Sequence, residues 1–199
     1  LGPGDVPYVL HRTLHALVAA WLDVVSVVAV GHRGFHGVSR FTRTTVIDLA
    51  VLHRIRDLSL LAPLHNLVAA EVIAAARVAL PGVPHAAAFD TAFHATLPEE
   101  AYLYAVPYEW YSEWGYRRYG FHGLSVAWSS ERATALLGRH ELGVIVAHLG
   151  AGCSVSAVWQ GRSVSTSMGM TPLEGVVMAT RAGSVDPGML LAAQRDHGL

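Results

Sequence analysis

Four residues with the chemistry needed to handle phosphate stand at the ends of expected strands or in turns. Arg33 follows a β-branched run, Asp90 follows a short apolar run, and His122 and Arg181 stand in glycine-containing turns. Two arginines, a histidine and a carboxylate suit phosphoryl transfer, because there the protein positions the reactants and neutralises negative charge spread over phosphate oxygens. These four residues are the candidate catalytic residues.

Each of the four also has an ordinary structural explanation. An arginine after a strand most often forms a surface salt bridge of small energetic value. An aspartate in that place is often a helix cap, and a histidine beside Phe121 is often a hydrogen-bonded structural residue. Their occurrence together with a glycine loop favours the chemical interpretation.

The glycine loop is the run from His148 to Ser154, which contains Gly150 and Gly152. Such a turn lets backbone N–H groups approach an anion, although glycine hairpins also occur in sheets that bind nothing. All 14 basic residues are arginine, so the chain contains no lysine. This excludes a phosphate loop of the lysine type, and phosphate must be held by arginine, histidine, backbone amides or a metal.

Composition narrows the class of protein further. The 199 residues are 52% hydrophobic and 15% charged with a net charge of −1, which excludes a disordered chain and a generic nucleic-acid binder. A lone Cys153 excludes a disulfide framework and a cysteine-based zinc site. His32 and His36 have the i, i+4 spacing of a zinc-binding helix, but they lie in a glycine-containing loop with no glutamate between them.

The elements that must position these residues alternate between helix and strand, which indicates an α/β sheet with ligands at the carboxyl ends of its strands. The apolar run Leu14–Val30 is too short and too polar for a membrane span. The pattern predicts helices over Leu14–Trp21, Thr44–Arg56, Leu67–Leu80 (capped by Asn66) and Ser125–Leu137. It predicts strands over Val24–Val30, His85–Phe89, Val144–Leu149, Ser154–Trp159 and Arg162–Ser167, with a hairpin turn at Gln160-Gly161.

Nine short blocks match the signature motifs of one family, in its order and with its spacing. They are VGHRGFHG at 30–37, LAPLHN at 61–66, FDTAFH at 89–94, YAVPYEWY at 104–111, RRYGFHG at 117–123, HLG at 148–150, TSMGMTPLEG at 166–175, TRAG at 180–183 and DP at 186–187. The chain thus resembles the acetokinase family, the carboxylate kinases that act on acetate, propionate or butyrate.

The resemblance implies an α/β fold of the ribonuclease-H-like, actin-like ATPase type, shared with sugar kinases, Hsp70 and actin. That fold has two domains with ATP and Mg²⁺ in a cleft. We expect residues 1–92 to be the C-terminal portion of the first actin-like domain, and residues 93–199 the N-terminal portion of the second. The implied reaction is ATP + acetate ⇌ ADP + acetyl phosphate by direct in-line transfer, within organic acid metabolism leading to acetyl-CoA.

The resemblance also implies a role for each matched residue. Arg33 is expected to hold the substrate carboxylate and the transferring phosphoryl group, with Arg181 as its partner. Asp90 is expected to be the essential carboxylate, and His122 to stabilise the phosphoryl group in flight. The residues implied for the substrate site are Arg33, Phe35, Leu64, His65, Phe121 and Pro172, and those for the ATP phosphates are His148, Gly150, Gly152 and Ser154.

The chain departs from the family pattern at several positions. Ala151 stands where members usually have asparagine, Val126 where they have a second histidine, and Leu67 where they have proline. Phe35 replaces a smaller residue, so we expect acetate to be preferred over longer acids. These departures leave two alternatives open: a kinase of propionate or another short acid, and a non-catalytic pseudokinase remnant.

The family's opening strand and its later half, with the adenosine site and a magnesium-associated glutamate, have no counterpart in this sequence. We therefore expect the chain to be the middle of such a kinase, inactive alone, with Mg²⁺ ligands mostly outside it and no metal site within it. The resemblance further implies ATP and acetate as substrates, a cytoplasmic location, a homodimer when full length, and no nucleic-acid or membrane partner.

Overall fold

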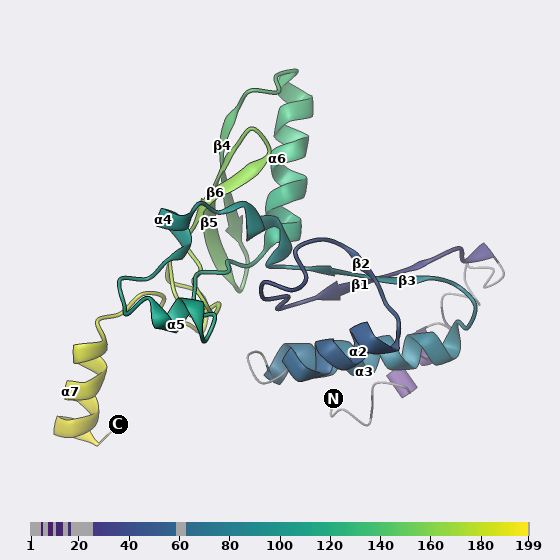
Figure 1. The fold of residues 1–199 in the computed structure, drawn as a ribbon, viewed down its shortest axis with the longest axis horizontal. Coiled ribbons are helices and arrows are strands. Elements are labelled where there is room, and N and C mark those ends of the chain that lie inside the picture. Colours follow the sequence, from purple (N-terminus) through teal and green to yellow (C-terminus); the bar gives the residue numbers. More distant parts are fainter. Residues whose placement is uncertain are drawn as a thin grey trace. The chain divides into compact units, whose positions relative to one another are not determined.

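The computed structural model describes residue 5, residues 8–9, 11–13 and 16, and residues 26–58 and 63–198, with the side chains of residues 63–65 left out. The chain divides into two compact units, Leu1–Ala92 and Phe93–Leu199. Figure 1 shows both, and each is considered by itself. The helix expected over Leu14–Trp21 lies outside the described residues, apart from Ala16.

The first unit contains a three-stranded sheet made of β1 (Val30–Gly34), β2 (Thr45–Val46) and β3 (His85–Phe89). The strand order is β1-β3-β2, with β1 parallel and β2 antiparallel to the central β3. The prediction of a strand over residues 85–89 is confirmed. Alternate side chains of β3 are buried, as expected where one face of a sheet packs on a core.

Of the strand expected over Val24–Val30, residues 24 and 25 lie outside the described residues, and residues 26–29 are not in a strand, so the expectation is wrong over its described part. The observed β1 begins where that prediction ends, because pairing with β3 starts at Val30 opposite His85 and continues to Gly34. Val28 is 83% exposed, so the β-branched run before β1 is not covered on both faces. Arg33 therefore lies within a strand instead of following one.

Two helices, α2 (Leu49–Asp57) and α3 (Pro63–Ala79), lie side by side along the sheet (Figure 1). The helix expected from Thr44 begins five residues later, because residues 45–46 pair with β3 and Asp48 caps the helix by accepting a hydrogen bond from the Val51 amide at 2.7 Å. The second helix was expected to start after Asn66 but starts at Pro63, a residue well suited to the first helical position.

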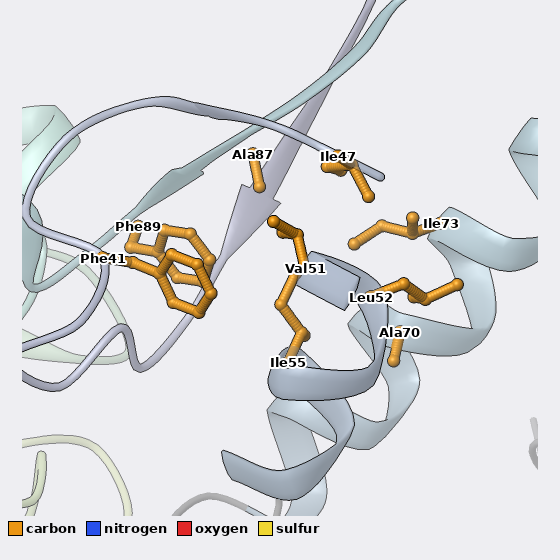
Figure 2. Close-up of a cluster of buried hydrophobic side chains, with 9 residues drawn as sticks. All are labelled: Phe41, Ile47, Val51, Leu52, Ile55, Ala70, Ile73, Ala87 and Phe89. Carbon is orange, nitrogen blue, oxygen red and sulfur yellow. The ribbon is translucent and has the colours of Figure 1, made fainter. Parts of the chain in front are cut away.

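A hydrophobic core fills the space between this sheet and the two helices. Figure 2 shows the Phe41 and Phe89 rings stacked face to face, with centroids 4.6 Å apart. Ile55 of α2 and Ile73 of α3 are almost completely buried beside them. The cluster comprises Phe41, Ile47, Val51, Leu52, Ile55, Ala70, Ile73, Ala87 and Phe89.

The second unit is built on an antiparallel sheet with order β4-β5-β6. Its α6 packs on the sheet through Val126, which is fully buried against Val146 and Val158. The elements are a 3-10 helix at Ala92–Thr96, α4 (Glu99–Tyr102), α5 (Glu109–Ser112), α6 (Gly123–Leu137), β4 (Gly143–Leu149), β5 (Cys153–Trp159), β6 (Arg162–Thr166) and α7 (Pro187–His197).

The sequence predicted the middle of this unit well. Helix α6 and the three strands lie within two residues of their expected bounds. Gln160 and Gly161 both have positive φ, 49° and 75°, which is the backbone of a tight hairpin turn. In the described part of the chain no helix is both long and apolar enough to cross a membrane.

Two histidines on neighbouring strands form a hydrogen-bonded pair in the first unit. His32 Nε2 lies 2.9 Å from His85 Nδ1, and His85 Nε2 lies 3.3 Å from the Leu80 carbonyl oxygen. Because a carbonyl only accepts, we assign the proton of His85 to Nε2, and its Nδ1 then accepts from His32. Burial, and secondly the proximity of His85, lower the pKa of His32 from its ordinary value of 6.5.

The core of the first unit allows a test of packing. We expect Ile55→Ala to lower the free energy of unfolding by about 2–5 kcal/mol, because it removes a fully buried side chain between α2, α3 and the sheet. Leu49→Ala on the same helix is the control, since Leu49 is 67% exposed. Denaturant unfolding followed by circular dichroism measures both variants, and equal losses would contradict this core.

The histidine pair predicts a pH dependence. Since the folded pKa of His32 is lowered, the unfolded chain binds a proton first as the pH falls below 6.5, and stability decreases as the pH falls further through the folded pKa. His85→Gln should raise the pKa of His32 toward 6.5, since it removes the unfavourable proximity of a second imidazole but not the burial. Imidazole NMR titration measures this pKa, and an unchanged value in the variant would contradict the pairing.

Candidate active site

The first group of candidate residues is the ion pair of Arg33 and Asp90, both in the first unit. Because β1 runs parallel to β3, Gly34 pairs with Phe89 and the next residue, Asp90, donates its amide to the Gly34 carbonyl at 3.1 Å. The Arg33 Nε lies 2.9 Å from Asp90 Oδ1, and Nη2 lies 2.6 Å from Oδ2. This is the two-pronged arrangement that suits a guanidinium and a carboxylate.

The two partners differ sharply in exposure. The Asp90 side chain is 1% exposed, whereas that of Arg33 is 62% exposed. The hydrogen bond to Asp90 raises the pKa of Arg33, against the lesser effect of burial, so the guanidinium is charged at every physiological pH. The buried carboxylate thus fixes an exposed cation, and we interpret Asp90 as acting through Arg33.

The loop that follows β1 is held by side chains from distant parts of the first unit. Asn66 Oδ1 accepts from the His36 amide, and Asn66 Nδ2 donates to the His36 carbonyl, both at 3.1 Å. The Thr91 hydroxyl accepts from the Gly37 amide at 3.0 Å. Asn66 therefore holds the loop after Arg33 instead of capping a helix, and sequence reasoning missed this role.

Three residues expected in the substrate site lie close to this loop in sequence. Phe35 is half-buried in the segment directly after Arg33. The backbone of Leu64 and His65 belongs to α3, and their side chains lie outside the description. Their part in binding the substrate stays a prediction.

The second group of candidates lies in the second unit and is centred on His122. This residue adopts a left-handed backbone, with φ 59° and ψ 19°, directly before the first residue of α6. The His148 ring stacks on the His122 ring, with centroids 3.9 Å apart. The start of a helix of this length carries partial positive charge, so the pair of imidazoles lies where an anion is favoured.

Each imidazole is oriented by a serine. The Ser154 Oγ lies 2.9 Å from His122 Nδ1, and the Ser125 Oγ lies 2.9 Å from His148 Nδ1. Ser154 is fully buried and contacts His122, and its contact with ATP phosphate stays a prediction. The corresponding role of Ser125 went unnoticed, because a serine near the start of a helix looks like a capping residue.

The glycine loop between β4 and β5 brings Arg181 to the same place. A Cβ built at Gly152 would lie 2.8 Å from Arg181 Nη2 and 3.1 Å from His122 Nε2, so any side chain here would push these two groups away from the backbone. The Gly150 amide donates to the Gly152 carbonyl at 3.0 Å and closes the loop. The predicted loop residues and two of the predicted catalytic residues thus converge.

The two residues of this unit predicted to line the substrate pocket, Pro172 and Phe121, differ in how deeply they are buried. Pro172 is half-buried, and its carbonyl accepts a hydrogen bond from Arg181 Nη1 at 2.7 Å. Phe121 is fully buried, and its carbonyl lies 2.9 Å from His94 Nε2. The contact of Phe121 with a substrate stays a prediction, and in this structure its ring presents no surface.

Two of the departures from the family pattern are also explained. Val126 stands at a position in the core, where an apolar side chain packs against the sheet, so a valine is accommodated without loss of packing. Ala151 is exposed at the tip of the glycine loop, and its carbonyl accepts from the Ala179 amide at 3.3 Å. The methyl group of alanine offers no polar contact there.

The carboxylate, imidazole and thiol groups of the described residues decide whether a magnesium ion could be held here. Among the residues that the structure describes, no three or more histidine, cysteine, aspartate or glutamate side chains lie together in a way that could hold a metal ion. Asp90 is committed to Arg33 through both carboxylate oxygens. The described residues therefore do not fit a resident magnesium ion.

Similarity to known proteins agrees with this arrangement. The family model described as "Acetokinase family" matches residues 8–199. Acetate kinase of Geobacter metallireducens is 52% identical over 169 residues, which make up 84% of this chain and 40% of that protein. Acetate kinase of Thermotoga maritima is 50% identical over 179 residues, 89% of this chain and 44% of that protein. The chain thus spans less than half the length of these curated relatives.

Solved structures give the same result. Acetate kinase of Porphyromonas gingivalis superposes with a TM-score of 0.90 at 38% identity, covering 97% of this chain and 50% of that one. A propionate kinase of Francisella tularensis superposes with a TM-score of 0.89 at 40% identity, covering 96% and 50%. These likenesses confirm the predicted α/β fold of the actin-like ATPase class. Because the family model matches nearly the whole length of this chain, the chain belongs to the acetokinase family.

Proposed function

We propose that this chain carries part of the active site of an acetate kinase, which transfers the γ-phosphoryl group of ATP reversibly to acetate. The observation that best supports this is the meeting of Arg181 Nη2 and His122 Nε2 above Gly152. A permanent cation and an imidazole beside a backbone without a side chain suit the negatively charged oxygens of phosphate, and this chain contains no lysine that could take their place.

Arg33 supplies the second cation that this reaction needs. Its guanidinium is exposed yet fixed by the buried Asp90, so it can hold a carboxylate or phosphoryl oxygen in a defined orientation. Acetate is ionised at neutral pH, so one of its oxygens attacks the γ-phosphorus while the bond to the leaving ADP oxygen breaks, and no proton has to be removed. The protein contributes position and charge, not acid or base chemistry.

The substrate proposed is acetate, with propionate as the alternative. Phe35 follows Arg33 by two residues, and its bulk leaves less room for a longer acyl chain than a smaller residue would. The similarity to a structure described as a propionate kinase keeps the alternative in view. A single methylene is worth about 10–200-fold in discrimination by an apolar pocket.

A pseudokinase is the alternative of another class. Ala151 motivates it, because the asparagine usual in the family would reach toward the nucleotide phosphates from the exposed loop tip. All four candidate catalytic residues are present, with Arg33 bound to Asp90 and with Arg181 and His122 both close to Gly152. This favours an active enzyme over a remnant. Calorimetric titration with ATP separates the two, since a remnant would bind no nucleotide.

The finer expectations from the family are part of the same proposal. They are ATP and ADP as nucleotide substrates, magnesium accompanying the nucleotide, a cytoplasmic protein in acetate metabolism, and a homodimer. Family membership supports them, and the described residues add no ligand set for the metal.

An activity assay tests the proposal directly. The chain expressed with its flanking coding sequence should form acetyl phosphate from ATP and acetate in the presence of Mg²⁺, with a kcat/KM for acetate about tenfold or more above that for propionate. Residues 1–199 alone should be inactive, because they span less than half of the matched acetate kinases. Absence of acetate-dependent turnover by the longer protein would contradict the proposal.

The two arginines should be essential in that assay. We expect Arg33→Lys and Arg181→Lys each to lower kcat by about 10³-fold, because lysine keeps the charge but lacks the fork that holds oxygen atoms in place. Arg54→Lys on α2 and Arg132→Lys on α6 are matched controls, since both arginines are exposed. Activity near wild type in either test variant would refute its assigned role.

A further inference from the structure

Arg118 lies four residues before His122 and makes an unusual number of contacts for a residue outside the predicted site. Its Nη1 donates to the carbonyl oxygens of Thr166, Ser167 and Met168 at 3.4, 3.2 and 3.1 Å. Its Nη2 donates to Glu174 Oε1 at 2.7 Å, in an ion pair whose arginine is only 20% exposed. One guanidinium thereby fastens the segment that follows β6 at both of its ends.

The second oxygen of Glu174 is also engaged. The Tyr104 hydroxyl donates to Glu174 Oε2 at 2.5 Å and accepts from the Met170 amide at 2.8 Å. Burial, and secondly this hydrogen bond, raise the pKa of Tyr104 to about 12, so the hydroxyl keeps its proton at neutral pH. A Cβ at Gly169 would overlap both Glu174 and the Tyr104 hydroxyl, so a side chain here would break their contact.

The fastened segment connects the two functional side chains of the second unit. The amides of residues 119 and 120, shortly before His122, both donate to the Gly169 carbonyl at 3.1 Å. Further along, the Pro172 carbonyl accepts from Arg181 Nη1 at 2.7 Å. Displacing this segment would therefore move His122 and Arg181 relative to each other.

An isolated ion pair at a surface contributes little to stability, and this is the ordinary explanation of the Arg118–Glu174 contact. This contact differs because it is partly buried and engages both carboxylate oxygens of Glu174, while the same guanidinium donates to three consecutive backbone carbonyls. We propose that Arg118, Glu174 and Tyr104, here called the Arg118 network, are positioning residues that hold Arg181 and His122 close to Gly152 for phosphoryl transfer. The inference rests on the proposed function.

Loss of the Arg118 network should affect turnover more than substrate binding. A displacement of about 1 Å in a reacting group can cost about 10²-fold in rate. Interactions made only in the transition state lower kcat while leaving KM unchanged. We therefore expect Arg118→Lys, Glu174→Gln and Tyr104→Phe to lower kcat about 10–100-fold and to change KM for ATP and acetate less than about twofold.

Matched controls are available in the same unit. Arg132→Lys and Glu131→Gln change exposed residues of α6, and Tyr108→Phe changes a tyrosine that is 58% exposed. Tyr104→Phe removes only one oxygen atom, so it keeps the comparison informative if a charged variant fails to fold. All variants are made in the chain expressed with its flanking coding sequence, and folding is checked by thermal melting.

A second readout is independent of turnover. Pyrophosphate is titrated into each protein while the His122 imidazole resonances are followed by NMR. In the wild type and the controls these resonances should shift as pyrophosphate binds, whereas in the network variants the shift should be smaller or need a higher concentration. A wild-type His122 that does not respond would overturn the inference, since the anion would then not meet this residue.

The two readouts distinguish failure of the inference from failure of the proposed function. A kcat loss with unchanged KM and an altered His122 response supports the inference. A kcat equal to that of the controls, or an altered KM alone, or a wild-type-like His122 response in the variants overturns it. If the wild type forms no acetyl phosphate, the proposed function fails, and the His122 response alone decides whether the Arg118 network positions this residue.

Discussion

A carboxylate removed from water needs a positive partner, and Asp90 at the end of β3 finds it in Arg33 of the neighbouring strand. The parallel pairing of β1 with β3 places the two side chains together, and the packing of α2 and α3 against the sheet keeps that pairing in register. Because Asp90 is buried and Arg33 is exposed, the cation is held rigidly while its surface remains open. The sheet, the core and the loop after β1 all serve this placement.

The second unit also holds a cation in a fixed orientation, but through different contacts. Here the fixed charge belongs to Arg181, whose guanidinium donates to the Pro172 carbonyl instead of to a buried carboxylate. The stacked imidazoles of His122 and His148 are each tied to a serine hydroxyl. Glycine at position 152 lets both functional groups approach the backbone closely.

Local patterns in the sequence predicted the elements whose formation depends on near neighbours. The strand over residues 85–89, helix α6 and the hairpin at Gln160 follow from apolar runs and turn residues. The position of β1 could not be predicted, because it depends on pairing with a strand more than fifty residues away. The strand was therefore predicted over the run with most β-branched residues, at positions 24–30, although Val28 in that run is exposed.

The candidate site shows the same division. Strand-end reasoning and the family motifs selected Arg33 and Asp90, and the structure places them in contact. Asn66 was interpreted as a cap, since asparagine caps helices well, whereas its partner is the backbone of a distant loop. The contact of Tyr104 with Glu174 joins residues seventy positions apart, a distance over which no periodicity or spacing carries information.

The claim that Asp90 acts through Arg33 is central to this account, and a double-mutant cycle on kcat/KM tests it most directly. Arg33→Ala, Asp90→Ala and the double variant are measured in the chain expressed with its flanking coding sequence, with folding verified for each. If the carboxylate acts only by orienting the guanidinium, the double variant should be scarcely slower than Arg33→Ala alone. Losses that multiply in the double variant would show that Asp90 acts independently and would contradict the account.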